Sequence, residues 1–319
     1  HYATCGGCKF QHWREDAYRA WKQARVAEVL GAAGLDTSVV KPMFDAHGAG
    51  RRRVSLHVRK QEGQWVAGFM EQKSHDLVAL SACPVLVPAL QRAPDIAARL
   101  GAVLGPCDVA VTLADNGLDV AVRAERQAVA SRMPALTDIF SAAGLVRLAL
   151  NGESVMQREA PFISIGKAQV PLPVQSFLQA TQDGEAVLVQ QVLSLLRKPK
   201  HVADLFSGVG TFSFPLAEQA RVTAIDSDKP AIAALQAGVR GAQGLKPITA
   251  EVRNLFVAPL TPQELAGFDA VVLDPPRAGA EAQAKMLVKS KVPQVIYVSC
   301  DAQSFARDWA VPRVMGKKP

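Results

Sequence analysis

The sequence is poor in charged residues, aromatic residues and cysteines. Charged side chains make up 20% and aromatic side chains 6% of the 319 residues, whereas 49% are hydrophobic. This balance excludes a disordered chain and supplies enough apolar material for the cores of two or more domains. Five cysteines are too few for a miniprotein held together by disulfides.

Long apolar runs are also missing. No stretch approaches the roughly 18 uninterrupted apolar residues of a membrane span, and the N-terminal HYATCGGCKF lacks the apolar core of a signal peptide. We therefore expect no membrane association and a cytoplasmic location. In that compartment thiols stay reduced, and cysteines tend to be metal ligands or catalysts.

Positive charge exceeds negative charge moderately. The 36 Lys and Arg residues against 29 Asp and Glu residues give a net charge of +7, and no arm or tail holds the excess. This charge suits a polyanionic partner such as RNA, and it equally suits an ordinary basic enzyme. The Arg51–Arg53 triplet leaves the same choice open, between a solvated loop and a phosphate contact.

The first half of the sequence predicts a helix followed by mostly antiparallel strands. Apolar residues recur at helical spacing over 11–33, and Gly31 is a stop signal. Alternation over 54–58 predicts one strand, and 64–70, after the Glu62-Gly63 turn, is the predicted return strand. Residues 89–104 are a predicted helix. Three hairpins are predicted at 109–122, 146–157 and 162–172, two of them around an Asn-Gly turn. We expect a first segment over 1–34 and a central β domain over 35–172.

The pattern changes after Pro173. Short continuous apolar runs at 202–206, 222–225, 270–273 and 295–298 alternate with helical stretches. Strands without polar alternation are typical of a parallel sheet covered by helices on both faces. The fold class is therefore α/β, with a Rossmann-like domain over 173–319.

Three strand ends carry residues suited to chemistry. In VADLFSGVGTF, Gly208 and Gly210 let the backbone approach a ligand, and Asp226 ends the next strand, where an acid can bind a ribose diol. Ser213 stands where a dinucleotide fingerprint has its third glycine, which favours a cofactor without phosphates, such as S-adenosylmethionine. The alternative is an ordinary tight turn.

The other two strand ends supply an acid and a thiol. VVLDPPRAG fixes Asp274 at the end of a buried strand, where it either binds a polar edge of a ligand or caps a helix. VIYVSCD ends in Cys300, which is either a buried apolar cysteine or a nucleophile. Because Cys300 falls at the same sheet edge as the other motifs, the sequence favours the nucleophile.

Together these motifs resemble the RNA uracil-5-methyltransferases, which make 5-methyluridine in ribosomal and transfer RNA. DLFSGVGTF, DPPRAG and YVSCDAQSFARD carry the resemblance, and FLQAT is similar to the family's Phe-x-Gln-x-Asn segment. CGGCKFQHW with Cys83-Pro84 resembles the iron–sulfur ligands of the branch that acts on 23S ribosomal RNA.

The resemblance implies specific roles. Cys300 is the implied nucleophile, and ribosomal RNA is the implied partner. The sequence leaves the oligomeric state open, with a monomer favoured. The residues implied to bind S-adenosylmethionine and uracil are Gln179, Phe206, Thr211, Asp226, Asn254 and Asp274, beside Gly208 and Gly210. Cys5, Cys8 and Cys83 are the implied ligands of a [4Fe–4S] cluster.

The sequence departs from the family at several points. The fourth cluster cysteine and the His-Val-Glu segment with the family's general base do not occur in these 319 residues. Thr181 replaces the usual Asn, and Asp301-Ala302 replaces Asn-Pro. A zinc site completed by His12 or His1 is the alternative for the cysteines. Two other functions compete: an amino-methyltransferase acting on a nucleobase or a protein, and an RNA-binding iron–sulfur scaffold without catalysis.

Overall fold

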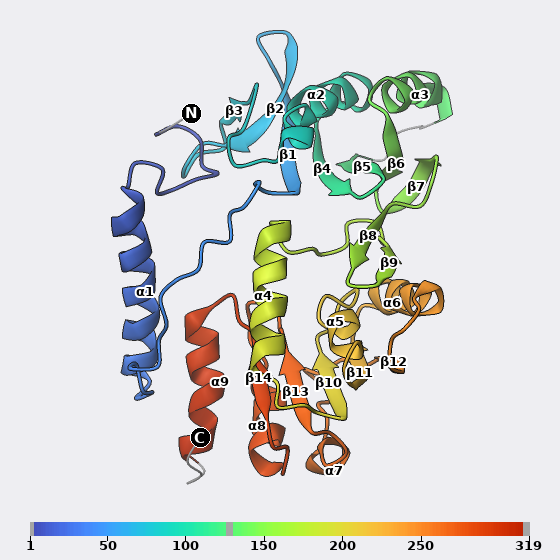
Figure 1. Cartoon of the computed structure of the whole chain (residues 1–319). Coiled ribbons are helices and arrows are strands. Elements are labelled where there is room, and N and C mark those ends of the chain that lie inside the picture. The colour runs from blue at the N-terminus through green and yellow to red at the C-terminus, as the bar shows by residue number, and fades with distance from the viewer. Residues whose placement is uncertain (1–2, 126–129, 315–319) are drawn as a thin grey trace. The chain divides into compact units, whose positions relative to one another are not determined.

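The computed structural model describes residues 3–125 and 130–314 (Figure 1). The chain divides into two compact units. Unit 1 contains His1–Trp13, Asp45–Ile163 and Pro171–Glu185, and unit 2 contains Arg14–Phe44, Ser164–Val170 and Ala186–Pro319. These bounds differ from the predicted segments 1–34, 35–172 and 173–319, because helix α1 (Glu15–Ala32) packs against helix α9 (Ala302–Val314) of unit 2.

Unit 1 is built on a seven-stranded sheet in the order β3-β2-β1-β4-β5-β6-β7. The strands are β1 (Arg53–Gln61), β2 (Gln64–Met70), β3 (Leu77–Ala79), β4 (Cys107–Ala114), β5 (Gly117–Ala124), β6 (Leu145–Leu150) and β7 (Glu153–Gln157). All neighbours are antiparallel except β5 and β6. The predicted strands and hairpins of this region are confirmed, whereas the short β3 has no signal in the sequence.

Two helices pack against this sheet. The predicted helix over 89–104 appears as a 3-10 turn (Pro88–Leu90) followed by α2 (Ala93–Leu104), which packs against β1 and β2. Helix α3 (Met133–Ala142) was not predicted, and it forms the crossover that makes β5 and β6 parallel. The core between sheet and helices contains the alternating Val54, Leu56 and Val58 of β1, as the period-2 pattern requires.

A two-stranded sheet of β8 (Phe162–Ile165) and β9 (Ala168–Pro171) follows, as the third predicted hairpin. Unit 2 then has a five-stranded parallel sheet in the order β12-β11-β10-β13-β14. Its strands are β10 (His201–Leu205), β11 (Arg221–Asp226), β12 (Ile248–Val252), β13 (Ala270–Leu273) and β14 (Val295–Tyr297). The predicted Rossmann-like arrangement is confirmed.

Both faces of this parallel sheet are buried. On one face, Val202, Val222 and Val272 pack against α4 (Gln182–Leu195) and α5 (Ser213–Ala217). On the other, Leu205 and Leu273 pack with residues of α7 (Pro262–Leu265) and α8 (Glu281–Lys289). Helix α6 (Lys229–Gly241) contacts β11 and β12. Burial on two sides explains the unbroken apolar runs in the sequence.

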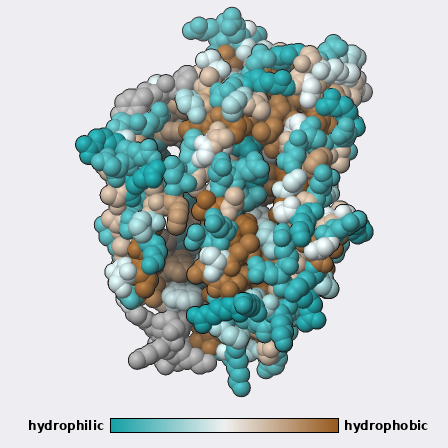
Figure 2. Space-filling model, viewed as in Figure 1, coloured by the Kyte–Doolittle hydropathy of each residue, from teal (hydrophilic) through white to brown (hydrophobic). Residues whose placement is uncertain are grey.

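Among residues 3–125 and 130–314, no helix combines the length and the apolar character needed to span a membrane. On the face drawn in Figure 2, hydrophilic side chains cover most of the surface, and apolar side chains are grouped in patches between them.

Candidate functional site

The chemistry-bearing residues of unit 2 lie at the carboxyl edge of its parallel sheet. Leu205, the last residue of β10, pairs with Ile225 and with Leu273, and Leu273 pairs in turn with Tyr297. The strand ends are therefore level. The segments carrying Phe206, Asp226, Asp274 and Cys300 leave the sheet at this one edge, as predicted. Ligands of open α/β sheets bind at such an edge.

The glycine turn after β10 leaves open space for a ligand. Phe206, Gly208 and Gly210 all have positive φ (62°, 54° and 103°). A Cβ added to Gly210 would collide with Phe214, so this glycine is required for close packing. A Cβ added to Gly208 would meet nothing within 4 Å. The turn is thus tightly packed against Phe214 at Gly210 and has open space beside Gly208.

Asp226 holds the glycine turn in place. Its carboxylate accepts hydrogen bonds from the backbone N–H of Gly208 (2.9 Å) and of Asp228 (2.8 Å). Each carboxylate oxygen has a further lone pair. Asp226 can therefore fix the turn and still accept a hydrogen bond from a ribose hydroxyl, the role predicted for it.

Asp204 lies beneath the turn and was not singled out in the sequence. It is fully buried, and its Oδ2 accepts a 2.5 Å hydrogen bond from Ser213 Oγ. In the described part of the chain, Asp204 Oδ1 and Ser207 Oγ are buried polar atoms without a hydrogen-bond partner. Burial, and to a smaller extent the nearby Asp274 and Asp226, raise the pKa of Asp204 to about 7. Ser213, which stands where the dinucleotide fingerprint has its third glycine, thus makes a buried hydrogen bond to Asp204.

The raised pKa of Asp204 predicts a pH-dependent stability. The folded protein keeps a proton that the unfolded chain loses above the ordinary carboxyl pKa of about 4. Stability from this group is fully present below that value and is lost as the pH rises to about 7. Asp204→Asn removes the buried charge, and we expect it to raise the melting temperature by roughly 5 °C at pH 8 and by little at pH 4.

A matched variant tests the cause of this effect. Ser213→Ala removes the hydroxyl that lowers the pKa of Asp204, so its loss of stability should extend to a higher pH than in the parent protein. Thermal melts from pH 4 to pH 9 measure both variants. An Asp204→Asn protein whose melting temperature changes equally at both ends of this range would contradict the account.

Asp274 and Cys300 stand on adjacent loops. The N–H of Asp274 donates to Leu205 O (3.2 Å), and the N–H of Val298 donates to Leu273 O (2.9 Å). Burial raises the pKa of Asp274 to about 6. Cys300 is exposed, so the alternative that it is a buried apolar cysteine is excluded.

Asp301, which directly follows Cys300, is hydrogen-bonded to the first turn of helix α9. Asp301 Oδ1 accepts hydrogen bonds from the N–H groups of Gln303 (3.0 Å) and Ser304 (2.9 Å). The Ser304 N–H, and to a smaller extent Arg277, lower the pKa of Asp301. Asp301, which replaces the family's Asn, therefore acts as a helix cap next to the thiol.

The other predicted cofactor residues of unit 2 flank the glycine turn. Thr211 directly follows Gly210 and is half-buried. Asn254 follows β12, and its Oδ1 accepts the N–H of Phe256 (3.0 Å). The Phe256 ring lies 5.5 Å from the ring of Phe206, which brings the Asn254 loop to the glycine turn. Gln179 belongs to unit 1, so its predicted part in this site stays a prediction.

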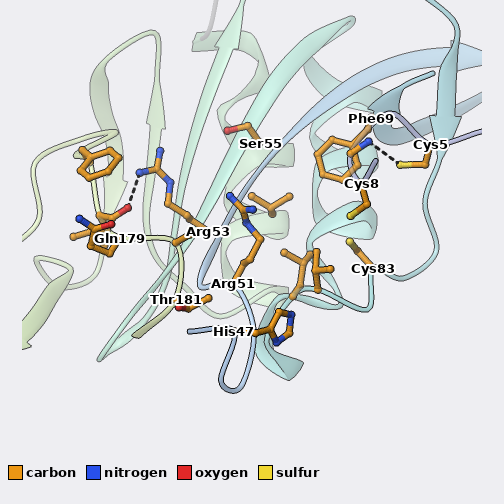
Figure 3. A pocket seen from close by; sticks show the side chains of 17 residues that line it. Cys5, Cys8, His47, Arg51, Arg53, Ser55, Phe69, Cys83, Gln179 and Thr181 are labelled. Atoms are coloured by element: carbon orange, nitrogen blue, oxygen red, sulfur yellow. Dashed lines mark hydrogen bonds between the residues drawn. The ribbon is translucent and has the colours of Figure 1, made fainter. Parts of the chain in front are cut away.

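Unit 1 contains a pocket of about 650 Å³. Figure 3 shows Arg53 and Gln179 at one side of the pocket, and Cys5, Cys8, Cys83 and Phe69 at the other. The three predicted ligand cysteines therefore share one pocket, and it is lined as well by Phe177, Thr181, His47 and Arg51.

The thiols of this pocket influence one another. Burial, and then the neighbouring Cys83 and Cys5, raise the pKa of the Cys8 thiol. Within the described residues, however, no three His, Cys, Asp or Glu side chains are arranged to hold a metal ion. Neither the iron–sulfur nor the zinc prediction is therefore confirmed, and His1 lies outside the described residues. Cys107 is buried in the core of unit 1 and does not line the pocket.

The three side chains of the Arg51–Arg53 triplet lie in different environments. Arg52 is buried, and its guanidinium donates to Glu185 (2.6 Å) and to Gln179 O (3.1 Å), so it is neither solvated nor free for RNA. Arg53 donates to Leu178 O (3.2 Å) and lies 5.4 Å from the ring centre of the exposed Phe177. Only Arg51 is exposed, at the pocket.

Comparisons with known proteins agree on one class. No family model matches the chain. An uncharacterized RNA methyltransferase of Brucella suis is 42% identical over 98% of this chain and 76% of its own, and one of Caulobacter vibrioides is 44% identical over 97% and 77%. A 23S rRNA (uracil(1939)-C(5))-methyltransferase of Halomonas elongata is 32% identical over 97% of this chain and 69% of its own.

A solved structure shares the fold. The Pyrococcus abyssi tRNA (uracil-54, C5)-methyltransferase, in complex with S-adenosyl-L-homocysteine, superposes with a TM-score of 0.75 at 23% identity. The match covers 96% of this chain and 77% of that one.

Proposed function

Because the chain belongs to the RNA (uracil-5-)-methyltransferase family, we propose that it methylates carbon 5 of a uridine in RNA through a covalent bond between Cys300 and the base. The observation that carries the proposal is the exposed Cys300 thiol at the same sheet edge as Asp274 and the open glycine turn. This arrangement supports a thiol nucleophile beside a cofactor site.

The chemistry requires a nucleophile because carbon 5 of uracil is unreactive. Addition of the Cys300 thiolate to carbon 6 makes carbon 5 electron-rich. Bound S-adenosylmethionine would give its methyl group to carbon 5 and leave as S-adenosylhomocysteine. Loss of the carbon 5 proton to a base then expels the thiolate and restores the ring. Cysteine suits both steps, since a thiolate is a strong nucleophile and a good leaving group.

The residues around the glycine turn are suited to a cofactor without phosphates. We propose that Asp226 accepts a ribose hydroxyl, that Phe206 and Asn254 flank the adenosine, and that Gly208, Gly210 and Thr211 approach the cofactor with their backbone. A Cβ on Gly208 would meet nothing within 4 Å, and Ser207 Oγ has no hydrogen-bond partner among residues 3–125 and 130–314; both observations support a ligand there. Asp274, with its raised pKa, would bind a polar edge of the uracil or of the cofactor.

The pocket of unit 1 is proposed to contact the RNA. Arg51 and Arg53 supply positive charge, and the exposed Phe177 ring supplies a stacking surface beside a guanidinium. Taking an RNA base out of its stack costs free energy, and such a platform would compensate part of that cost. The resemblance to the Halomonas enzyme favours 23S ribosomal RNA as the substrate.

Cys5, Cys8 and Cys83 are proposed as three ligands of a [4Fe–4S] cluster. Their common pocket supports a site in which thiolates gather around a positive centre. The cluster would shape unit 1, and no reaction step depends on it.

We expect Cys8→Ser to lower bound iron by at least about half in protein purified under anaerobic conditions, because serine is a poor ligand for iron–sulfur clusters. Iron and sulfide analysis, with the visible absorbance band, measures this loss. Cys107→Ser is the control and should retain the iron of the parent protein. Parent protein that carries zinc, or no metal at all, would contradict the cluster.

Location of the transferred methyl group tests the proposed function. Ribosomal and transfer RNA lacking 5-methyluridine are incubated with the protein and S-adenosylmethionine, digested to nucleosides and analysed by mass spectrometry. We expect 5-methyluridine from ribosomal RNA. A methyl group on nitrogen would indicate an amino-methyltransferase. Failure to bind S-adenosylmethionine at millimolar concentration would indicate a scaffold.

A further inference from the structure

We propose that Asp308, in helix α9, is a positioning residue that fixes the loop carrying Asp274 and the loop carrying Cys300 relative to one another. The inference rests on the proposed function, because it assigns both loops to one reaction. Asp308 does not belong to the predicted site, and it lies in the helix that follows the Cys300 loop.

The carboxylate of Asp308 joins two elements. Its Oδ2 accepts a hydrogen bond from the backbone N–H of Ala280 (2.6 Å), which ends the loop after Asp274. The same oxygen accepts one from the hydroxyl of Tyr297 (2.7 Å), the last residue of β14. Cys300 follows Tyr297 by three residues. One oxygen atom therefore ties together the two segments that lead to the predicted acid and the predicted nucleophile.

This carboxylate is buried and charge-paired. The Asp308 side chain has no exposed area, and its Oδ1 accepts hydrogen bonds from Arg307 Nε (2.8 Å) and Nη2 (2.6 Å). Arg307 Nη2 also donates to Ala278 O (2.8 Å) in the same loop. Asp308 and Arg307 thus contact the loop after Asp274 and Tyr297, and Arg307 also lies 3.8 Å from Glu281 at the start of α8.

The loop is shaped for this contact. Gly279 has a φ of 82°, and a Cβ there would lie 2.5 Å from Asp308 Oδ2 and 2.5 Å from Arg307 Nη2. A side chain at this position would therefore displace the ion pair. The glycine of the DPPRAG motif is explained by close approach of the loop to Asp308.

A second link between the loops is much weaker. Arg277 Nε lies 3.3 Å from Asp301 Oδ2, but the Arg277 side chain is 86% exposed. Exposed ion pairs contribute little to stability, whereas removing the partners of a buried, hydrogen-bonded carboxylate costs much stability. The buried Asp308 contacts therefore dominate the coupling between the loops.

The test is Asp308→Asn, which keeps the shape of the side chain but turns one acceptor into a donor facing Arg307. We expect kcat for uridine methylation to fall about 10- to 100-fold, as for a displacement of reacting groups by about 1 Å. The dissociation constant of S-adenosylmethionine, measured by calorimetry, should change less than threefold. Hydrogen exchange should become faster in the 275–280 loop.

Other outcomes overturn the proposal. If the folded Asp308→Asn protein keeps its kcat and its rate of hydrogen exchange in the 275–280 loop within twofold of the parent values, Asp308 is not a positioning residue. Loss of cofactor binding in parallel with kcat would show a general structural role. If wild-type protein makes no 5-methyluridine, the proposed function fails by itself, and the exchange measurement still decides whether Asp308 fixes the loops.

A milder variant keeps the test open should Asp308→Asn not fold. Tyr297→Phe removes one hydrogen bond and leaves the Arg307 pair and the Ala280 contact in place. We expect a 3- to 10-fold lower kcat with unchanged cofactor binding. Unchanged kcat in this variant would show that β14 is not fixed through Asp308.

Discussion

Replacing Cys300 with alanine is expected to lower methyl transfer to uridine by at least about 10³-fold, to the background of the assay. Without the thiolate, carbon 5 of the ring stays unreactive, and no other group of the site can substitute for covalent activation. The exposed position of Cys300 makes this a direct test, because removal of its side chain leaves no cavity in the core. Single-turnover methylation with saturating S-adenosylmethionine measures the effect.

Two controls separate chemistry from folding in this experiment. The Cys300→Ala protein should bind S-adenosylmethionine with an affinity close to that of the parent protein. Cys107→Ala, which removes a thiol from the core of unit 1, should keep methyl transfer within a few-fold. A Cys300→Ala protein that still makes 5-methyluridine at more than one-tenth of the parent rate would refute the nucleophile.

Truncation of Asp119 to alanine is expected to cost about 3–5 kcal/mol of the free energy of unfolding. Asp119 and Arg147 form a buried two-point ion pair across β5 and β6, with N–O distances of 2.8 and 2.6 Å and only 6% of either side chain exposed. Arg147 also donates to Leu172 O (2.8 Å) and Pro173 O (3.2 Å). Without Asp119, a guanidinium would remain buried without its counter-charge. Urea denaturation measures the loss.

Paired variants test the reason for this loss. Asp119→Leu with Arg147→Met replaces both charges by apolar groups and should recover much of the stability, since no charge is then left unpaired. Arg123→Met, at an exposed position of β5, should change stability by less than about 0.5 kcal/mol. Equal losses at Arg123 and Asp119 would contradict the account.

Much of the fold could be predicted because the hydrophobic period differs between the two units. The alternation of Val54, Leu56 and Val58 specifies a sheet buried on one face, and the unbroken run at 270–273 specifies one buried on both. Edge strand β12 carries mostly exposed or half-buried residues and lacks such a run. Helix α3 has only Leu136 and Ile139 buried, so its pattern is too short to stand out.

The candidate site was only partly predictable. Glycines and strand-end residues such as Asp226, Asp274 and Cys300 follow from a local rule, because parallel strands bring their carboxyl ends to one edge. No such local rule identifies Asp204, Arg52 or Asp308, because their roles depend on partners distant in sequence or on complete burial. Arg52 pairs with Glu185, 133 residues away. Unusual charged residues inside apolar motifs, such as Asp204 in VADLF, are the signal that could have identified one of them.

The most direct test of the central claim is a covalent complex with RNA containing 5-fluorouridine at the target position. Fluorine at carbon 5 cannot be removed as a proton is, so the bond to carbon 6 persists after methyl transfer. We predict a complex that withstands denaturation, forms only with S-adenosylmethionine present, and yields a modified peptide at Cys300 by mass spectrometry. A modified peptide elsewhere, or methylated RNA without any complex, would contradict the mechanism.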